Sequence, residues 1–241
     1  LINRADFTDE QLCELSQAVV KAQAPSPLLR IFVGERCMTL AMLKMPPAQI
    51  ARIFSLSGSP SESRADARQK TLAVTFHRFA GLIDRSTIIY LDMMEDYVEA
   101  IQLPPDRRRQ AISTIEGRYR AALGTDLVLG HVTAALGRID MINLKGITHL
   151  QTAQAALAIQ RYRLAAGELP DTLADLVPTY LDAVPEDPFD GNDLRYKKLE
   201  VGFVVYSIGE DSLDDGGKEK LPRSKRTGNS RYWDITFIVE R

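Results

Sequence analysis

The sequence predicts an α+β protein in which a helical N-terminal region precedes a long helix packed on a small three-stranded antiparallel sheet. Through most of the first 149 residues, apolar side chains recur at helical spacing, whereas three short segments near the C-terminus are rich in β-branched and aromatic residues. The 241-residue chain is 45% hydrophobic and 26% charged, which is typical of globular proteins. We therefore expect a helical region over 1–149, of unknown role, and a compact α+β module over 150–241.

The N-terminal region is expected to form successive helices that proline and glycine separate. Thr8 and Gln11 have the capping-box spacing that opens a first helix, and the prolines of APSP end it. The run over 28–44 is apolar on most faces, so we expect a buried helix there. Further helices are expected after the Pro46–Pro47 pair, within 64–101, after the Pro104–Pro105 pair, and from about Thr125 through Gly137 and Gly146.

The C-terminal module is expected to begin with an alanine-rich helix from Leu150 that stops at Gly167. A short helix should follow over 170–177. The proline- and aspartate-rich run after it contains EDPFDGN, in which we expect a turn that sets the angle between helix and sheet. Three strands are then predicted, over 194–198, 202–208 and 234–240. A sheet this small cannot bury its apolar face alone, so it should pack on the long helix.

Charge and motif content argue against several functional classes. Thirty basic residues against 32 acidic residues give a formal charge of −2, so we expect no nucleic-acid partner. With only two cysteines, the chain is no disulfide-dense scaffold, and Cys13 with Cys37 remain either a disulfide pair or free thiols. Charged residues interrupt each apolar stretch well before about 18 residues, so membrane attachment would need a segment outside this chain. The common nucleotide-binding and nucleophile motifs do not occur.

The order of motifs in the last third resembles the C-terminal module of the major pseudopilins of type II secretion systems. The resemblance is carried by AIQRYRLAAGELPDTLADLVPTYLDAVPEDPFDGNDLRY, by GFVVYSIGEDSLDDGG, and by the DI that opens the last strand. It covers about 150–241. It implies a pilin-like fold and a non-enzymatic, extracytoplasmic protein, periplasmic and membrane-anchored in its full-length form. It also implies assembly with protein partners or with copies of itself.

In that family, the loop after the YSxG strand binds a structural calcium ion. The resemblance assigns Ca²⁺ ligands to the carbonyl of Ile208 and to the carboxylates of Asp211 and Asp234. The sequence departs from the family where Tyr232 replaces a second acid, and in a basic insertion over 218–231. Calcium takes six to eight hard oxygens, so Asp214 and Asp215 are candidates to replace the missing acid. A solvated acidic turn without metal is the alternative interpretation.

Other polar groups have plainer interpretations. His77, His131 and His149 show no metal-ligand spacing, and the acidic residues over 92–99 are expected to form a solvated helix face. The helix expected after Pro104–Pro105 is the most basic one in the chain. Its basic residues are Arg107, Arg108, Arg109, Arg118 and Arg120. A helical enzyme or ligand-binding domain in 1–149, with the C-terminal module as an accessory, is the alternative function. It would require a concave apolar pocket in those residues.

Overall fold

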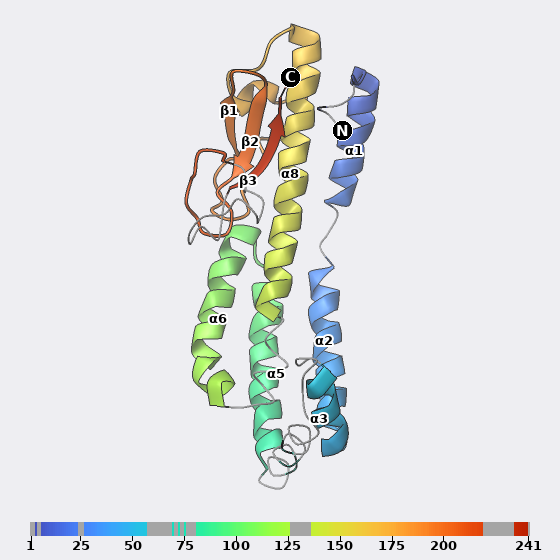
Figure 1. The fold of residues 1–241 in the computed structure, drawn as a ribbon, viewed down its shortest axis with the longest axis vertical. Coiled ribbons are helices and arrows are strands. Elements are labelled where there is room, and N and C mark those ends of the chain that lie inside the picture. The colour runs from blue at the N-terminus through green and yellow to red at the C-terminus, as the bar shows by residue number, and fades with distance from the viewer. Residues whose placement is uncertain are drawn as a thin grey trace. The chain divides into compact units, whose positions relative to one another are not determined.

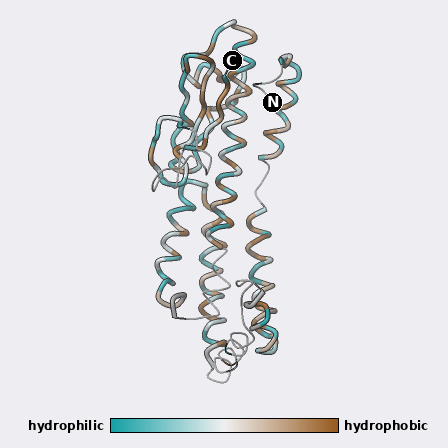
Figure 2. Tube along the Cα trace, in the orientation of Figure 1, coloured by the Kyte–Doolittle hydropathy of each residue, from teal (hydrophilic) through white to brown (hydrophobic). Residues whose placement is uncertain are grey.

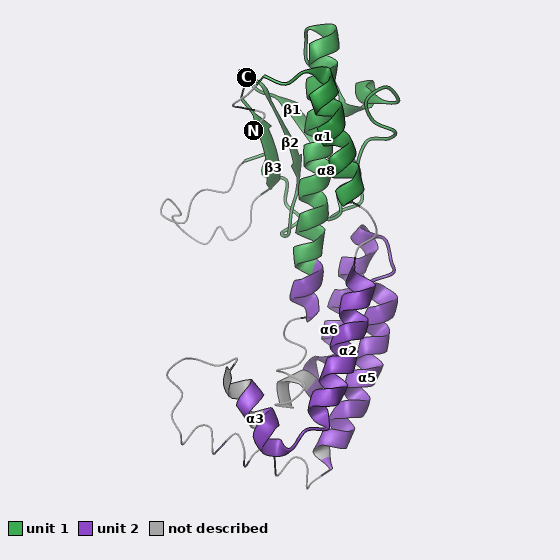
Figure 3. Cartoon of the chain, turned by 90° about the vertical axis from the view of Figure 1, so that its right-hand side faces the viewer, with its two compact units in different colours: residues 1–26, 141–241 green, residues 27–140 purple. Residues whose placement is uncertain are grey.

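The computed structural model describes residues 3, 6–23, 27–56, 69, 72, 75, 81–125, 136–218 and 234–240. It contains α-helices and a small three-stranded antiparallel sheet, so the predicted α+β class is confirmed (Figure 1). The chain divides into two compact units, shown in Figure 3: residues 27–140, here called the helical unit, and residues 1–26 with 141–241, here called the α+β unit. The units differ from the predicted segments 1–149 and 150–241 because the first 26 residues fold with the C-terminal ones.

Among its described residues, the helical unit contains α2, α3, α5, α6 and the start of α8, and proline or glycine precedes several of these helices. The bounds of the first four are α2 Leu28–Leu43, α3 Pro47–Leu56, α5 Leu82–Ala100 and α6 Pro105–Thr125. Prolines at the first position of α3 and α6 suit helix starts, because that position needs no N–H donor. Gly81, at φ 68°, directly precedes α5, and most of the predicted 64–101 run before it lies outside the described residues.

The core of the helical unit lies where α5 packs against α2 and α6. Phe32 of α2 and Tyr97 of α5 meet with ring centroids 5.6 Å apart, and both side chains are buried. Met93 and Met94 of α5 fill the remaining space around them. Truncating such buried side chains typically lowers the free energy of unfolding by about 2–5 kcal/mol each. The residues of α5 therefore contribute much of the stability of this unit.

One buried ion pair also stabilises the helical unit. Arg108 of α6 lies 3.4 Å from Asp140, and both are less than 10% exposed. Burial raises the pKa of Asp140, and Arg108 partly offsets that rise. Arg118 pairs with Asp96 of α5 at 2.6 Å. Two members of the predicted basic helix therefore already have acidic partners within the chain.

The α2 helix forms where the sequence predicts it, but it is not buried on every side. Phe32 and Leu43 face the core, whereas Leu29 and Val33 are 45% exposed and Met38 is 68% exposed. Figure 2 shows the hydrophobic character of α2 and of the sheet strands. The prediction of a buried helix over 28–44 is therefore confirmed for only one side of α2, because apolar composition does not show how many neighbours a helix has.

In the α+β unit, two helices precede the sheet. The first is α1 Asp9–Ala22, where the Thr8–Gln11 capping box is confirmed by reciprocal hydrogen bonds. The second is α8 Leu136–Ala166, one continuous helix of 31 residues whose first five belong to the helical unit. Gly146 does not divide it, and no new helix begins at Leu150. Arg161 of α8 donates to Asp9 of α1 at 2.8 Å and ties the two helices together.

The sheet follows α8 after a 3-10 helix, η1 Leu173–Leu176, which is shorter and tighter than the helix predicted over 170–177. The strands are β1 Arg195–Lys198, β2 Phe203–Ser207 and β3 Ile235–Val239, in the order β1-β2-β3 with antiparallel pairs throughout. The three predicted strands are thus confirmed to within one residue at each end.

The core of the α+β unit lies between α8 and the sheet. Ala155, Ala156 and Ala158 of α8 are fully buried, and Phe203 and Val205 of β2 belong to the same cluster. Small side chains on a helix let a facing sheet approach closely. Among the described residues, no helix is both long enough and apolar enough to cross a membrane.

Candidate functional site

The predicted site lies where β2 ends and an acidic loop begins. All five residues of β2 are buried, although a strand with one solvent-facing side would alternate. Phe203 and Val205 belong to the core with α8, so Val204 and Tyr206 point to the opposite face of the sheet. The acidic loop, which we define as residues 209–217, lies against that second face at Gly217.

Gly217 brings the acidic loop onto the sheet. A Cβ atom at this residue would lie 2.9 Å from Cδ1 of Tyr206 and 3.2 Å from Cγ1 of Val204. Its φ of 76° is in the left-handed region, which side chains other than glycine rarely adopt. Gly216 has a similar φ of 75° but faces open space. The two glycines therefore serve the same turn, but only Gly217 needs glycine for its close contact.

Asp234 holds the end of the acidic loop to the start of β3. Its Oδ1 accepts the backbone N–H of Asp215 at 3.3 Å, and its Oδ2 accepts that of Gly217 at 2.7 Å. The residue is 4% exposed. Burial raises the pKa of Asp234, the two backbone donors lower it, and the nearby carboxylates of Asp214 and Asp215 raise it again. The net result is that the pKa of Asp234 lies above the usual value for an aspartate.

Asp214 and Asp211 contribute to local turns. Oδ1 of Asp214 accepts the backbone N–H of Gly216 at 2.8 Å, and Oδ1 of Asp211 accepts that of Leu213 at 3.2 Å. Asp214 also lies beside Tyr206, whose pKa is raised by burial and then by the charge of this carboxylate and a hydrogen bond with it. The loop thus brings Asp214 and Asp215 into the electrostatic range of Asp234.

The predicted calcium ligands have the hard-oxygen chemistry that calcium prefers. Within the part of the chain that the structure describes, however, no group of three or more acidic, histidine or cysteine side chains is arranged to hold a metal ion. Ile208, the proposed carbonyl ligand, is buried with Leu144 and Phe189. A calcium site at Ile208, Asp211, Asp214, Asp215 and Asp234 therefore stays a prediction.

A neighbouring centre is built on Asp187 of the EDPFDGN run, in which the sequence predicts only a turn. This carboxylate is fully buried and accepts four hydrogen bonds. Its donors are the hydroxyl of Ser207 at 2.7 Å, the backbone N–H groups of Ile208 and Phe189 at 3.0 Å each, and Arg195 at 2.6 Å. Asp187 thereby joins the predicted EDPFDGN turn to β1 and to the end of β2.

Arg195 of β1 is the cation of this centre. Besides Asp187, it pairs with Asp190 through both terminal nitrogens. Burial opposes the charge on Asp190, but hydrogen bonds from Arg195 and Asn192 outweigh it and lower the pKa of that carboxyl group. Asp190, Asp187 and Asp214 favour the charged form of Arg195 in turn, so its pKa is raised despite burial. The sequence signals for this centre are the EDPFDGN run and Arg195, which follows five residues after Asp190.

The remaining predicted groups are not gathered at either centre. His149 is exposed on α8, while Cys13 and Cys37 are free thiols in different units. His77, His131 and all of the basic insertion except Lys218 lie outside the described residues. Asp96, from the predicted acidic helix face, accepts hydrogen bonds from Arg118 and Tyr119.

Comparison with known proteins assigns no family to this arrangement. A scan against protein-family models matches none, and searches of the curated proteins and of the solved structures likewise give no match.

Proposed function

We propose that the chain is a non-enzymatic, extracytoplasmic interaction or assembly protein. In this proposal, residues 150–241 are a pseudopilin-like module, and calcium stabilises its acidic loop. Protein partners or further copies of the chain are the proposed binding partners, and any membrane attachment is proposed to come from a segment outside this sequence.

One observation carries the proposal: the acidic loop is fixed to the strand that follows it by a buried aspartate. The backbone N–H groups of Asp215 and Gly217 both donate to Asp234, and two more carboxylates lie nearby. Such an arrangement accumulates negative charge, which a divalent cation would relieve. The order of long helix, turn, and three antiparallel strands with this loop before the last strand is also the order that the resemblance implies.

Extracellular and periplasmic calcium sites generally work by stabilising structure. A metal that binds only the folded protein adds its binding free energy to the stability of that protein. At about 100 times its dissociation constant, the ion would contribute about 2.7 kcal/mol. The proposed role for calcium is therefore to keep the acidic loop on the sheet, not to activate a substrate.

The test is calcium binding by isothermal titration calorimetry on the full chain, with magnesium as the competing ion. Asp211→Asn is the informative variant, because its amide oxygen can still accept the N–H of Leu213 while the negative charge is lost. Asp182→Asn, an exposed acid outside the loop, is the matched control. We expect the wild type and Asp182→Asn to bind calcium equally and Asp211→Asn to bind it at least tenfold more weakly.

Limited proteolysis is a second, independent test of calcium binding by the acidic loop. Calcium should protect cleavage sites in the acidic loop of the wild type, and it should protect those of Asp211→Asn less. Equal cleavage with calcium and with EDTA, together with no heat of binding, would remove the proposed metal.

A further inference from the structure

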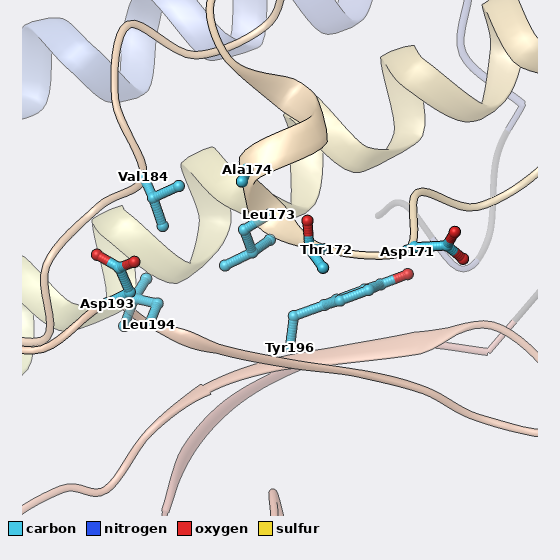
Figure 4. Close-up of a pocket in the computed structure, with 8 residues that line it drawn as sticks. All are labelled: Asp171, Thr172, Leu173, Ala174, Val184, Asp193, Leu194 and Tyr196. Atoms are coloured by element: carbon cyan, nitrogen blue, oxygen red, sulfur yellow. The ribbon is translucent and has the colours of Figure 1, made fainter.

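A cavity of about 250 Å³ lies in the α+β unit between η1 and β1 (Figure 4). Its middle is apolar, with Leu173, Val184, Leu194 and the ring of Tyr196 around it. Figure 4 shows the carboxylates of Asp171 and Asp193 at opposite ends. Sites for drug-sized molecules begin at about 300 Å³, so this cavity suits a single long side chain better than a larger ligand.

Tyr196 forms the floor of this cavity and is held in place. Its hydroxyl donates to the backbone carbonyl of Pro170 at 3.0 Å, and its ring packs 6.1 Å from that of Phe203. The aromatic face is therefore a fixed surface against which an aliphatic chain or a cation can lie.

The surroundings of the cavity are predominantly acidic. Burial, and then the charges of Asp171 and Asp175, raise the pKa of Tyr196 to about 12. The backbone of Asp193, the acidic residue that lines one end of the cavity, is held by an isolated β-bridge with Glu186. The basic group at the other end is Lys198, whose Nζ lies 2.7 Å from Oδ1 of Asp171.

We propose that this cavity binds the side chain of a lysine presented by a protein partner. The methylene chain of a lysine would lie on Leu173, Leu194 and Tyr196, and its ammonium group would lie at the acidic end formed by Asp193. The inference rests on the proposed interaction function and adds the chemistry of the partner. It does not depend on calcium, because none of the predicted calcium ligands lines the cavity.

Lys198 gives the inference a distinctive consequence. The ammonium group of Lys198 already donates a hydrogen bond to the carboxylate of Asp171, and its positive charge repels an incoming ammonium group. Neutralising Lys198 should therefore strengthen binding, whereas neutralising Asp193 should weaken it. A cavity that merely collected apolar groups would respond to neither change.

The experiment is a methyl NMR titration of the full chain, with labelled leucine, valine and alanine methyl groups. The probe is Nα-acetyl-lysine methylamide, and the controls are the norleucine and glutamate analogues with the same blocked ends. We expect the lysine probe to shift the methyl signals of Leu173, Val184 and Leu194 in a saturable manner. We expect the norleucine analogue to shift them less and the glutamate analogue not to shift them.

Variants then distinguish recognition of the lysine charge from non-specific apolar binding. Lys198→Gln should bind the lysine probe about two- to fivefold more tightly, and Asp193→Asn about two- to fivefold more weakly, which is the range for exposed ion pairs. Asp84→Asn, an exposed acid in the helical unit, makes the same charge change elsewhere and should bind as the wild type does. Unchanged methyl spectra outside the cavity will show that each variant is folded.

The inference is overturned if the lysine and norleucine probes bind equally, if the glutamate probe binds better, or if no probe shifts these methyl groups. Repeating the titration in calcium and in EDTA separates this result from the proposed metal. Lysine binding in both buffers, with no calcium binding by calorimetry, would support the lysine site and contradict the proposed calcium site. Calcium binding without lysine binding would contradict the lysine site and support the calcium site.

Discussion

Two neighbouring parts of the α+β unit each bury a carboxylate, but only one of the two carboxylates is paired with a cation. At the EDPFDGN turn, Asp187 accepts four hydrogen bonds and has the guanidinium of Arg195 at 2.6 Å. At the acidic loop, Asp234 accepts two backbone N–H groups, and the charges next to it are those of Asp214 and Asp215. The first carboxylate has its cation within the chain. The second lies among further carboxylates.

This difference indicates where an added cation would act. A buried carboxylate that is already paired and fully hydrogen-bonded gains little from an ion. A carboxylate whose pKa is raised by burial and by like charges gains more, because the ion offsets both costs. The turn should therefore fold independently of calcium, and the acidic loop should depend on it.

The largest effect is expected at the turn. Asp187→Asn replaces an acceptor oxygen with an amide that faces the donors from Ile208 and Arg195, so unfolding should require about 3 kcal/mol less. Denaturant titration measures this loss, with Asp182→Asn as a control that should change stability by less than about 0.5 kcal/mol. The loss should be the same with calcium and with EDTA. A loss below about 1 kcal/mol would mean that the hydrogen bonds to Asp187 contribute little to stability.

The next effect concerns how the acidic loop contacts the sheet. Gly216→Ala and Gly217→Ala both force alanine into the left-handed region, which costs about 1–2 kcal/mol. Gly217→Ala must also displace Tyr206 and Val204, so it should cost at least about 1 kcal/mol more. Thermal unfolding of the two variants gives the difference directly. Equal stabilities would show that the loop does not lie against the sheet as described.

A pH titration sharpens the comparison at Asp234. Its folded-state pKa is raised, so its contribution to stability is fully present below its unfolded pKa and is lost as the pH rises through the folded value. A carboxyl ¹³C NMR titration in EDTA should give a midpoint above 3.8, and calcium should lower that midpoint. Asp190 should titrate below 3.8 in both buffers, because Arg195 and Asn192 stabilise its charged form.

The smallest effect is expected for the partly exposed ion pair between Nζ of Lys145 and Oε2 of Glu210, which lie 2.6 Å apart. Lys145→Met should change the free energy of unfolding by less than about 0.5 kcal/mol, because solvent screens such pairs. Added salt should reduce even this difference. A loss above about 1 kcal/mol would show that α8 stabilises the acidic loop through this charge.

The secondary structure was largely predictable because its signals are local. The three strands, the Thr8–Gln11 cap and the proline-led helices depend on residues that are close in sequence. The continuity of α8 was not predictable. Glycine lowers helix propensity, and the sequence predicts one helix through Gly137 and Gly146 and a second from Leu150, whereas α8 runs through all three residues without a break.

The candidate site was predictable only in part. The sequence locates the acidic loop, but hydrogen bonding to Asp234 joins residues 17 and 19 positions apart. The Asp187 centre depends on Ser207 and Ile208, which lie 20 and 21 positions away. Likewise, α1 packs with the C-terminal residues across a separation of 152 positions at Asp9 and Arg161. Such pairings follow from the fold and have no local pattern.

The most direct test of the account is a thermal melt of the full chain in calcium, in magnesium and in EDTA. At saturating calcium, the unfolding midpoint should rise by several degrees over that in EDTA, while magnesium should leave it nearly unchanged. The same midpoint in all three buffers would contradict a calcium-stabilised loop.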